Sequence, residues 1–433
     1  MRIVRTKLSG RNELDSPAIL DTSSIAILSA RLLLDLSPSA SMARKYEEEL
    51  VRSHLRMLYS VHENQETIVT GSSPEPLIAE ASAELMHSSV IINGKETPFM
   101  EVWKLLVQFV ERGLLPQGTI GQLLGRVFSI FAMDRAIEGT STKRELKYQT
   151  PVTVAEYYQA LLTDEAWKIL KDSTPANCSS LTEESREKRF EDVFADAYFH
   201  FSHYGKANDE TPLQDCYGWA LWLRGTAILC QLNQTRTDRA LPIFFSKPTG
   251  TLSAQSTSMA LDQDKTGQKE DPGTIAIQSA ENIGLFTQGQ KLPYIAAVHC
   301  YALTEDERIN TSHPNTYALQ SPKKDEAAPR YQIDFRGLAA YRNITESMKS
   351  DVRRMIDGTK TRLFTHHPRP GNLDLVRQML PLLNGDSSTT AWFRGLDKPL
   401  SGAAGGVPSQ GSGAGEGSGG PSVRNKKLKN KKQ

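Results

Sequence analysis

The sequence has little of what marks several large protein classes. It contains only four cysteines in 433 residues. Because no two of them form a CxxC pair, neither a disulfide framework nor a zinc site is predicted. Lysine and arginine together number 51, against 50 aspartate and glutamate residues. This balance predicts no global field that would steer polyanions, so any attraction to nucleic acid must be local.

A membrane span and a secretory signal are also missing. The most apolar early run, Ile25–Leu36, is interrupted by Arg31 and Asp35 and is shorter than the ~20 apolar residues that a bilayer span needs. The charged N-terminus is followed by Gly10 and polar residues and not by an apolar stretch, so no secretory signal is predicted. We therefore expect an intracellular protein, cytoplasmic or nuclear and not secreted, that makes no membrane contact.

Several catalytic signatures are absent. The sequence has no GxxxxGK[ST], no HExxH, no kinase signature set and no GxSxG outside the Gly/Ser-rich tail, which removes the enzyme classes defined by them. Gly121 and Gly125 resemble a fragment of a phosphate loop, but they lack the lysine, and close helix packing is the preferred interpretation. His200 and His203 have a metal-ligand spacing, yet the aromatic residues between and around them favour a packed segment.

The first half of the chain shows helical periodicity. Apolar residues recur at spacings of three and four among charged ones, as one face of an amphipathic helix requires. The segment around Trp219 and Trp222 is so apolar that we expect it inside the core. The predicted helices are Ser41–Val61, Pro74–His87, Pro98–Arg112, Gln122–Glu138, Val152–Leu170, Leu181–Tyr198 and Pro212–Leu232.

The second half changes to the pattern of strands. Short apolar runs rich in β-forming residues are bounded by glycine, proline or charged residues. They predict strands at Ala240–Phe245, Thr274–Gln278, Tyr294–Tyr301 and Tyr331–Phe335. The polar segment 246–272 predicts a mobile loop. Two helices, Ile344–Ile356 and Leu373–Leu383, are predicted to close the globular part.

These elements predict a mixed α+β or α/β fold, in which a helical N-terminal region packs with a small mixed-sheet unit. The predicted organisation is a partly helical extension over 1–40, a helical region over 41–180, an α/β unit over 181–397 and a disordered tail over 398–433. The tail is rich in glycine and serine and cannot bury enough apolar area to fold.

The tail ends in a cluster of basic residues with no acid among them. Such a run can act as a nuclear import address, as a grip on phosphate groups, or only as a solubilising segment. The six cations are Arg424, Lys426, Lys427, Lys429, Lys431 and Lys432.

One constellation points to a chemical site. Asp238 precedes the first predicted strand, and Gln278 ends the second. A carboxylate and a second oxygen ligand on neighbouring strands can hold Mg²⁺. A lysine two residues beyond the second ligand can orient water and stabilise charge on phosphate.

This arrangement resembles the PD-(D/E)xK, or restriction-endonuclease-like, fold. More narrowly, the chain looks like uncharacterised fungal proteins that are related to the nuclease-like domains of Crinkler-type effectors. The resemblance spans roughly residues 45–395. The stretches that carry it are Leu55–Tyr59, Gly71–Glu80, Phe199–Phe201, Leu223–Ala227, Asp238–Ile243 and Ile275–Asn282.

The resemblance assigns Asp238 as the first acid and Gln278 as the second oxygen ligand, but Ala280 occupies the position of the lysine. An alanine cannot orient water or offset phosphate charge. The resemblance therefore predicts a degenerate, non-catalytic nuclease-like module that binds nucleic acid or protein and needs no cofactor.

Two alternatives stay open. The first is a nuclease that uses Mg²⁺ or Mn²⁺ at Asp238 and Gln278, with Lys291 as a substitute cation and a further acid from Glu281 or from the Glu184–Glu191 helix. The second is an interaction scaffold whose helical half binds a protein partner, which predicts an exposed apolar groove on the helices and no polar cluster around Asp238.

Overall fold

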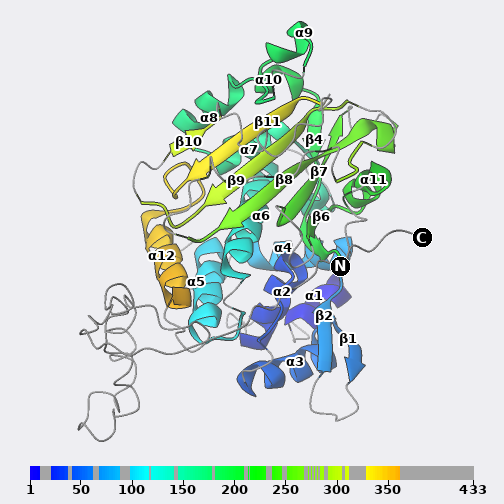
Figure 1. Ribbon diagram of the computed structural model, residues 1–433. Helices are drawn as coiled ribbons and strands as arrows, with labels where there is room; N and C mark the ends of the chain where they lie inside the picture. Colours follow the sequence, from blue (N-terminus) through cyan, green and yellow to red (C-terminus); the bar gives the residue numbers. More distant parts are fainter. Residues whose placement is uncertain are drawn as a thin grey trace, which may run out of the picture. The chain divides into compact units, whose positions relative to one another are not determined.

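N-terminal helices lead into one large sheet (Figure 1). The computed structural model describes residues 1–9, 21–37, 41–61, 68–87, 98–116, 119–140, 145–177, 181–208, 213, 215–230, 237–245, 251–267, 272, 275, 277, 280, 283–286, 291–304, 308–311 and 328–360. The predicted helix Leu373–Leu383 and the predicted tail with its six cations lie outside the described residues.

The N-terminal elements are mainly helical. They include one two-stranded antiparallel hairpin, β1–β2. In chain order the elements are α1 (Arg2–Ser9), α2 (Asp21–Leu32), α3 (Ser41–Ser53), β1 (Arg56–Val61), β2 (Ile68–Ser72), α4 (Pro76–His87), α5 (Pro98–Glu111) and α6 (Ile120–Gly139).

The following elements build the sheet and its covering helices. They are β3 (Val152–Thr153), α7 (Val154–Leu161), α8 (Asp164–Lys171), α9 (Glu183–Arg186), α10 (Phe190–Val193), β4 (Ala197–Phe199), β5 (His203–Lys206), α11 (Asp215–Leu223), β6 (Thr226–Leu229), β7 (Arg239–Phe245), β8 (Thr257–Lys265), β9 (Tyr294–Cys300), β10 (Arg308–Asn310), β11 (Arg330–Arg336) and α12 (Glu346–Lys360).

Within the part of the chain that the structure describes, the sheet has nine strands and mixed pairing. Its main path runs β10-β11-β9-β8-β7-β4-β3, and β6 pairs with both β5 and β7. The strands β8, β9 and β11 are parallel to one another, whereas β7 and β8 are antiparallel. The expected mixed α+β class is confirmed.

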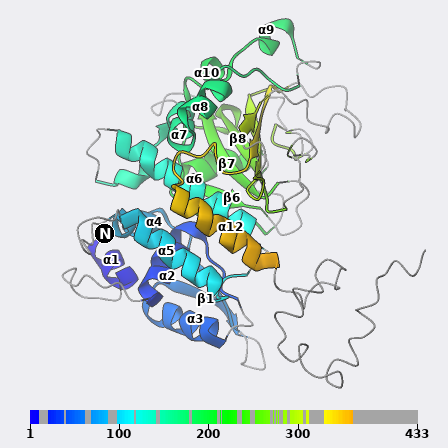
Figure 2. The same ribbon diagram turned by 90° about the vertical axis from the view of Figure 1, so that its left-hand side faces the viewer.

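Alternate residues of the central strands pack into two separate apolar layers, as the two-residue period of a strand requires. One layer, the first core cluster, joins the helices α6, α7 and α12 to one sheet face, with Ala260 of β8 and Ala297 of β9 as members. The second core cluster lies on the opposite face and includes Leu261 and Ala296. Figure 2 shows α6 and α7 together on one side of the sheet.

The longest periodic helices agree with the sequence. Structure and prediction coincide to within two residues at each end for α4, α5 and α6, and the predicted strands at β7, β9 and β11 are also present. Other predicted helices are wrong in part. The segment predicted as Ser41–Val61 ends as a helix at Ser53, and Leu55, with a φ of 62°, turns the chain into β1.

Three further predicted helices are broken by tertiary context. Val152–Leu170 divides into β3, α7 and α8, and Leu181–Tyr198 contains only the short helices α9 and α10 before β4. Pro212–Leu232 contains α11 followed by β6, with Gly225 at a φ of 60° between them. A Cβ at Gly225 would lie 2.8 Å from Gln149 Oε1, so the close approach and the left-handed turn both favour glycine.

The predicted mobile loop 246–272 is wrong because it contains the central strand β8, which is buried along nearly its whole length. The segment Thr274–Gln278 was predicted as the second strand. Its described residues Ile275 and Ile277 are not in a strand, and Ile277 instead packs in the second core cluster. Strand β8 therefore takes the place beside β7 that the sequence had assigned to Thr274–Gln278.

Helix α11 lies less deeply than its apolar composition predicts. Tyr217, Trp219 and Leu223 are exposed, and from position 217 to the end of α11 only Trp222 and Gly218 are buried. Among the described residues, no helix is both long enough and apolar enough to cross a membrane.

Candidate functional site

The candidate site is built around Asp238, which immediately precedes β7 and is half-buried. Its Oδ1 accepts a hydrogen bond from Gln122 Nε2 at 2.9 Å. Its Oδ2 accepts from Gln263 Nε2 at 2.9 Å and from the backbone N–H of Asp264 at 2.7 Å. Three elements, α6, β7 and β8, therefore converge on one carboxylate.

Strand β8 supplies the partner residues through its two-residue period. Arg239 of β7 pairs with Asp262 of β8, so Asp238 lies opposite Gln263. Gln263 and Lys265 point to the face of the second core cluster, whereas Asp264 points to the other face. The amide oxygen of Gln263 is buried and has no hydrogen-bond partner. The site face of β8 thus offers an oxygen ligand and, two residues further, a cation.

The opposite face of the same two strands holds a buried ionic cluster. Arg239 is fully buried, with Nε and Nη2 at 2.7 and 3.0 Å from the two oxygens of Asp264 and Nη2 at 3.0 Å from Asp262 Oδ2. Arg239 also donates to the hydroxyls of Ser129 and Tyr204. These contacts hold the end of β8 against β7. They thereby fix the position of the backbone N–H of Asp264, which donates a hydrogen bond to Asp238.

The surroundings of Asp238 disfavour the ionised form of its carboxyl group. Burial, followed by the nearby carboxylate of Asp264, raises the pKa of Asp238. The hydrogen bonds from Asp264 and Gln122 and the charge of Lys265 act in the opposite direction without cancelling the rise. A bound cation would favour the ionised carboxylate, because an opposite charge at short range lowers a carboxyl pKa.

Close packing of α6 brings Gln122 to the site. A Cβ at Gly121 would lie 3.2 Å from the side chain of Thr266, and one at Gly125 would lie 2.6 Å from Arg239 Cζ. Both glycines therefore allow α6 to approach the end of β8, as the packing interpretation predicts.

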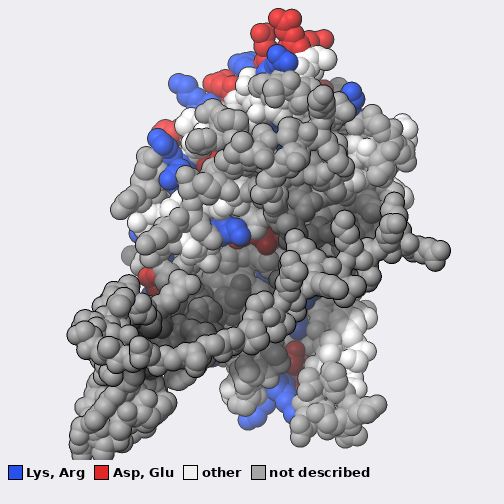
Figure 3. Space-filling view, in the orientation of Figure 1, with Lys and Arg blue, Asp and Glu red and all other residues white. Residues whose placement is uncertain are grey.

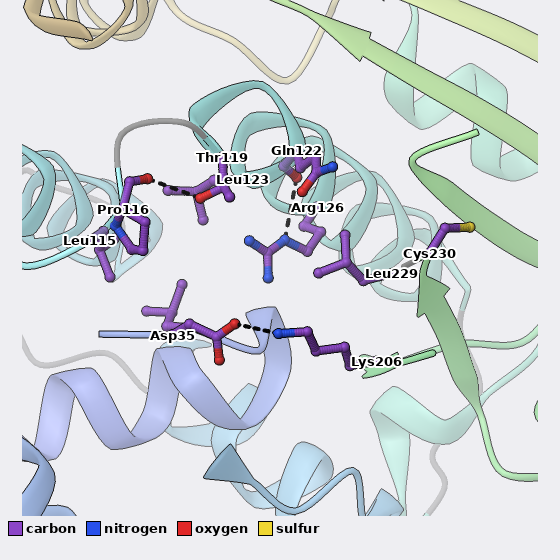
Figure 4. A pocket seen from close by; sticks show the side chains of 11 residues that line it. Asp35, Leu115, Pro116, Thr119, Gln122, Leu123, Arg126, Lys206, Leu229 and Cys230 are labelled. Atoms are coloured by element: carbon purple, nitrogen blue, oxygen red, sulfur yellow. Dashed lines mark hydrogen bonds and ion pairs between the residues drawn. The ribbon is translucent and has the colours of Figure 1, made fainter. Parts of the chain in front are cut away.

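Gln122 also lines a cavity of about 40 Å³ between α6 and the chain segment that follows α2 (Figure 4). Lys206 Nζ and Asp35 Oδ2 form an ion pair at 3.0 Å across the cavity. Arg126 there donates to the backbone oxygen of Leu33 at 2.8 Å. A cavity of this size holds water molecules but no nucleotide.

Of the other predicted site residues, those that the structure describes do not join this cluster. Gln278 and Glu281 lie outside the described residues. Ala280 is fully buried in the second core cluster and is not on a strand. Lys291 is exposed and precedes the N-terminal end of β9, whereas Lys265 pairs with the last residue of β9.

The acidic segment Glu184–Glu191, predicted as a source of a further metal ligand, also lies away from Asp238. Figure 3 shows acidic side chains gathered over α9, which projects from the molecule well away from β6, the strand that pairs with the start of β7. Glu184, on α9, therefore does not complete the shell around Asp238, and Glu191, on α10, instead forms an ion pair with Arg189 at 2.9 Å.

The two histidines are packed, as the aromatic context predicts. His200 Nδ1 lies 2.7 Å from the backbone oxygen of Trp222. The ring of His203 lies between the hydroxyls of Ser202 and Thr226, at 3.1 and 3.0 Å. Within the described ranges, no group of three or more His, Cys, Asp or Glu side chains is arranged to hold a metal ion.

Gln122, Gln263 and Lys265 are the site residues that sequence reasoning missed. A signal was present, because Gln263-Asp264-Lys265 has an oxygen ligand, any residue and a lysine in order. The polar composition of 246–272, with few large apolar groups, predicts a loop there and hides strand β8.

Comparison with known proteins identifies one domain. Residues 14–159 match the family model of a domain of unknown function (DUF8736). This range includes Gln122 and ends before Asp238 and Gln263. No curated protein and no solved structure matches the chain.

Proposed function

We propose that the Asp238 cluster is a divalent-cation-dependent phosphodiesterase site of the nuclease type. The observation that carries this proposal is the alignment of Asp238, immediately before β7, with Gln263 and Lys265 on the site face of β8. It supplies the lysine that Ala280 does not provide, on the strand that actually pairs with β7. The pattern is that of the PD-(D/E)xK resemblance, with glutamine at the second ligand position.

The residues fit Mg²⁺ or Mn²⁺ better than a softer metal, because their donors are carboxylate and amide oxygens. The partnerless, buried oxygen of Gln263 supports a ligand role. Rotation of the Gln122 amide would present a further oxygen, since amide oxygen and nitrogen are nearly isosteric. One carboxylate is enough for Mg²⁺, which keeps several waters and also binds substrate phosphate.

Each residue then has a defined task. Asp238 and Gln263 would hold the cation, which when bound supplies positive charge to phosphate and lowers the pKa of water. Lys265 would donate a hydrogen bond to a non-bridging phosphate oxygen and offset the charge that develops there. Hydrolysis adds water across one P–O bond. The water oxygen bonds to phosphorus, the ester oxygen leaves, and it takes up a proton.

The non-catalytic module is the second candidate. It is favoured by the single carboxylate that the β7–β8 pair places at the described site, since Asp262 and Asp264 are bound to Arg239 on the other face. A polar cluster around Asp238 is required by the nuclease hypothesis and is not expected of the scaffold hypothesis.

Cleavage assays distinguish these candidates. The purified protein is incubated with supercoiled plasmid, single-stranded DNA and RNA in Mg²⁺, in Mn²⁺ and in EDTA. We expect cation-dependent cleavage that falls by roughly 10²-fold or more in Asp238→Asn and in Lys265→Met, the scale seen when one group that stabilises transition-state charge is lost.

Lys291→Met is the matched control, because it removes an exposed lysine at the other end of β9. An equal loss of cleavage in Lys291→Met would contradict the proposal. So would the absence of cleavage by all the proteins, the wild type included. Mn²⁺ binding measured by calorimetry, weaker in Asp238→Asn than in the control, gives a readout that does not depend on turnover.

A further inference from the structure

Arg126 of α6 is a buried cation without an acidic partner. Only 4% of its surface is exposed. Its Nε donates to the backbone oxygen of Gln122 at 3.3 Å, and its Nη1 donates to the backbone oxygens of Leu32 and Leu33. Within the described residues, Arg126 forms no ion pair with a carboxylate, and its Nη2 has no hydrogen-bond partner. Neutral carbonyl groups therefore orient the guanidinium but do not compensate its charge.

The carboxylates whose charges act on Arg126 are bound by other cations. Asp264 is held by Arg239 at 2.7 Å, and Asp35 forms an ion pair with Lys206 at 3.0 Å. Burial lowers the pKa of Arg126 to about 10, although Asp35 and Asp264 act in the opposite direction. Arg126 therefore stays charged at neutral pH. Because a buried charge without a partner is costly, an anion beside Arg126 would be favourable.

The guanidinium of Arg126 points into the cavity that Gln122 lines. In Figure 4 it lies between Gln122 and the ion pair of Asp35 and Lys206. The side chains of Asp35 and Lys206 are 48% and 43% exposed, so the ion pair forms the rim of the cavity and Arg126 lies at its buried end. The volume of about 40 Å³ has room for about three water molecules, at ~10–15 Å³ each, or for one phosphate group in their place.

The N-terminus of α6 lies at the same cavity. This helix has 20 residues, and the cavity is lined by Thr119, directly before it, and by Gln122 in its first turn. Thr119 makes no side-chain capping hydrogen bond, and the first turn contains no acidic residue. A helix N-terminus carries roughly half a unit of positive charge, which favours anions such as phosphate. Arg126 and Lys206 add two positive charges to the cavity lining, against the one negative charge of Asp35.

We propose that this cavity binds a doubly charged phosphate group between Arg126 and Lys206. Arg126 Nη2 would donate to one phosphate oxygen, and Lys206 would turn from Asp35 to a second. A phosphate group fits better than a carboxylate, because it carries about 1.5 to 2 negative charges near neutral pH and offers three strong acceptor oxygens.

The source of this group is either free inorganic phosphate or the terminal phosphate of a nucleic-acid strand, which share the same chemistry. Gln122 connects the cavity to the candidate site, since it lines the cavity and donates to Asp238 Oδ1 at 2.9 Å. The inference goes beyond the proposed hydrolysis and does not require it.

Calorimetric titration of the full chain with inorganic phosphate, in EDTA and at constant ionic strength, measures the affinity. Lys206→Gln should weaken phosphate binding about tenfold, the scale of one hydrogen bond to a charged group. Asp35→Asn should strengthen binding about two- to fivefold, the scale of one exposed charge interaction. Opposite effects of two substitutions in one exposed ion pair are not expected from a general loss of structure.

The matched controls are Lys188→Gln and Glu184→Gln, because these residues form another exposed ion pair, at 2.9 Å. Both controls should bind phosphate as the wild type does. Arg126→Gln should weaken binding by more than about tenfold, and thermal unfolding without phosphate verifies that this variant is folded. Because Arg126 also holds the end of α2, the two rim variants decide the question if Arg126→Gln does not fold.

An oligonucleotide with a 5′-phosphate and its 5′-hydroxyl counterpart identify the source of the phosphate group. Competition with inorganic phosphate by the phosphorylated form alone would assign the cavity to the end of a strand. Competition by neither would assign it to free phosphate. Equal competition by both would mean that the cavity binds phosphodiesters, which would overturn the proposal.

Three further results would overturn the phosphate site. They are no binding of phosphate by the wild type, acetate binding as tight as phosphate binding, and equal effects of the rim variants and their controls. Phosphate binding that follows the predicted order of variants, in a protein that cleaves no nucleic acid, would support this site and contradict only the proposed hydrolysis.

Discussion

Replacing Arg239 by methionine tests how the end of β8 is held in place. The substitution keeps much of the side-chain volume and removes the guanidinium that contacts both Asp264 oxygens and Asp262. It leaves two carboxyl groups buried without their cation. Removing one partner of a buried ion pair typically costs about 3–5 kcal/mol, a large part of the ~5–15 kcal/mol that stabilises a typical protein.

The pH dependence of this loss has a definite sign. In the wild type, burial opposes ionisation of Asp262, but Arg239 and then His299 hold its pKa below the ordinary value. This carboxylate therefore contributes stability above its unfolded pKa, and the contribution is lost as pH falls through the folded pKa. In Arg239→Met, burial disfavours the ionised carboxylate of Asp262, and no guanidinium offsets this effect. Protonation of the carboxylate in acid therefore removes an unfavourable charge.

Urea unfolding from neutral pH to about pH 4 measures the effect. We expect the stability gap between wild type and Arg239→Met to be largest at neutral pH and to narrow in acid. Arg135→Met is the matched control, since Arg135 is exposed. A loss of less than about 1 kcal/mol at neutral pH, which is the size of an exposed-pair effect, or a stability gap that does not depend on pH, would show that Arg239 does not hold β8 through these carboxylates.

Three other outcomes are expected. Asp134→Asn should destabilise the protein by about 3–5 kcal/mol, because Asp134 is buried against Arg31. Burial opposes ionisation of Asp134, but Arg31 and His87 lower its pKa to about 2. The stability difference between wild type and Asp134→Asn should therefore vanish as pH falls toward 2. Acid unfolding of both proteins measures this difference. Gly125→Ala should lower the unfolding temperature, because its Cβ would overlap the Arg239 guanidinium; an unchanged temperature would contradict this. Cys230 and Cys300 are both buried, and burial raises the pKa of Cys230 well above its ordinary value, so mass spectrometry should find neither alkylated before denaturation.

The sequence by itself determined the elements whose pattern is local. The helices α4, α5 and α6 follow from apolar spacing along 12 to 20 residues. Strands β7, β9 and β11 follow from short runs of β-forming residues. The sequence also predicts Asp238 as a candidate ligand, because a carboxylate beside a strand is a local feature.

Only the tertiary structure decided where β8 lies. The carboxyl groups of Asp262 and Asp264 predict a loop, since a buried unpaired charge is costly, and the guanidinium that compensates them comes from Arg239 on another strand. The apolar run Thr274–Gln278 read as a strand because periodicity cannot distinguish a paired strand from a segment that packs on a sheet face. Long-range charge compensation thus places Gln263, with Lys265 two residues further, beside Asp238, whereas Ala280 packs in the second core cluster.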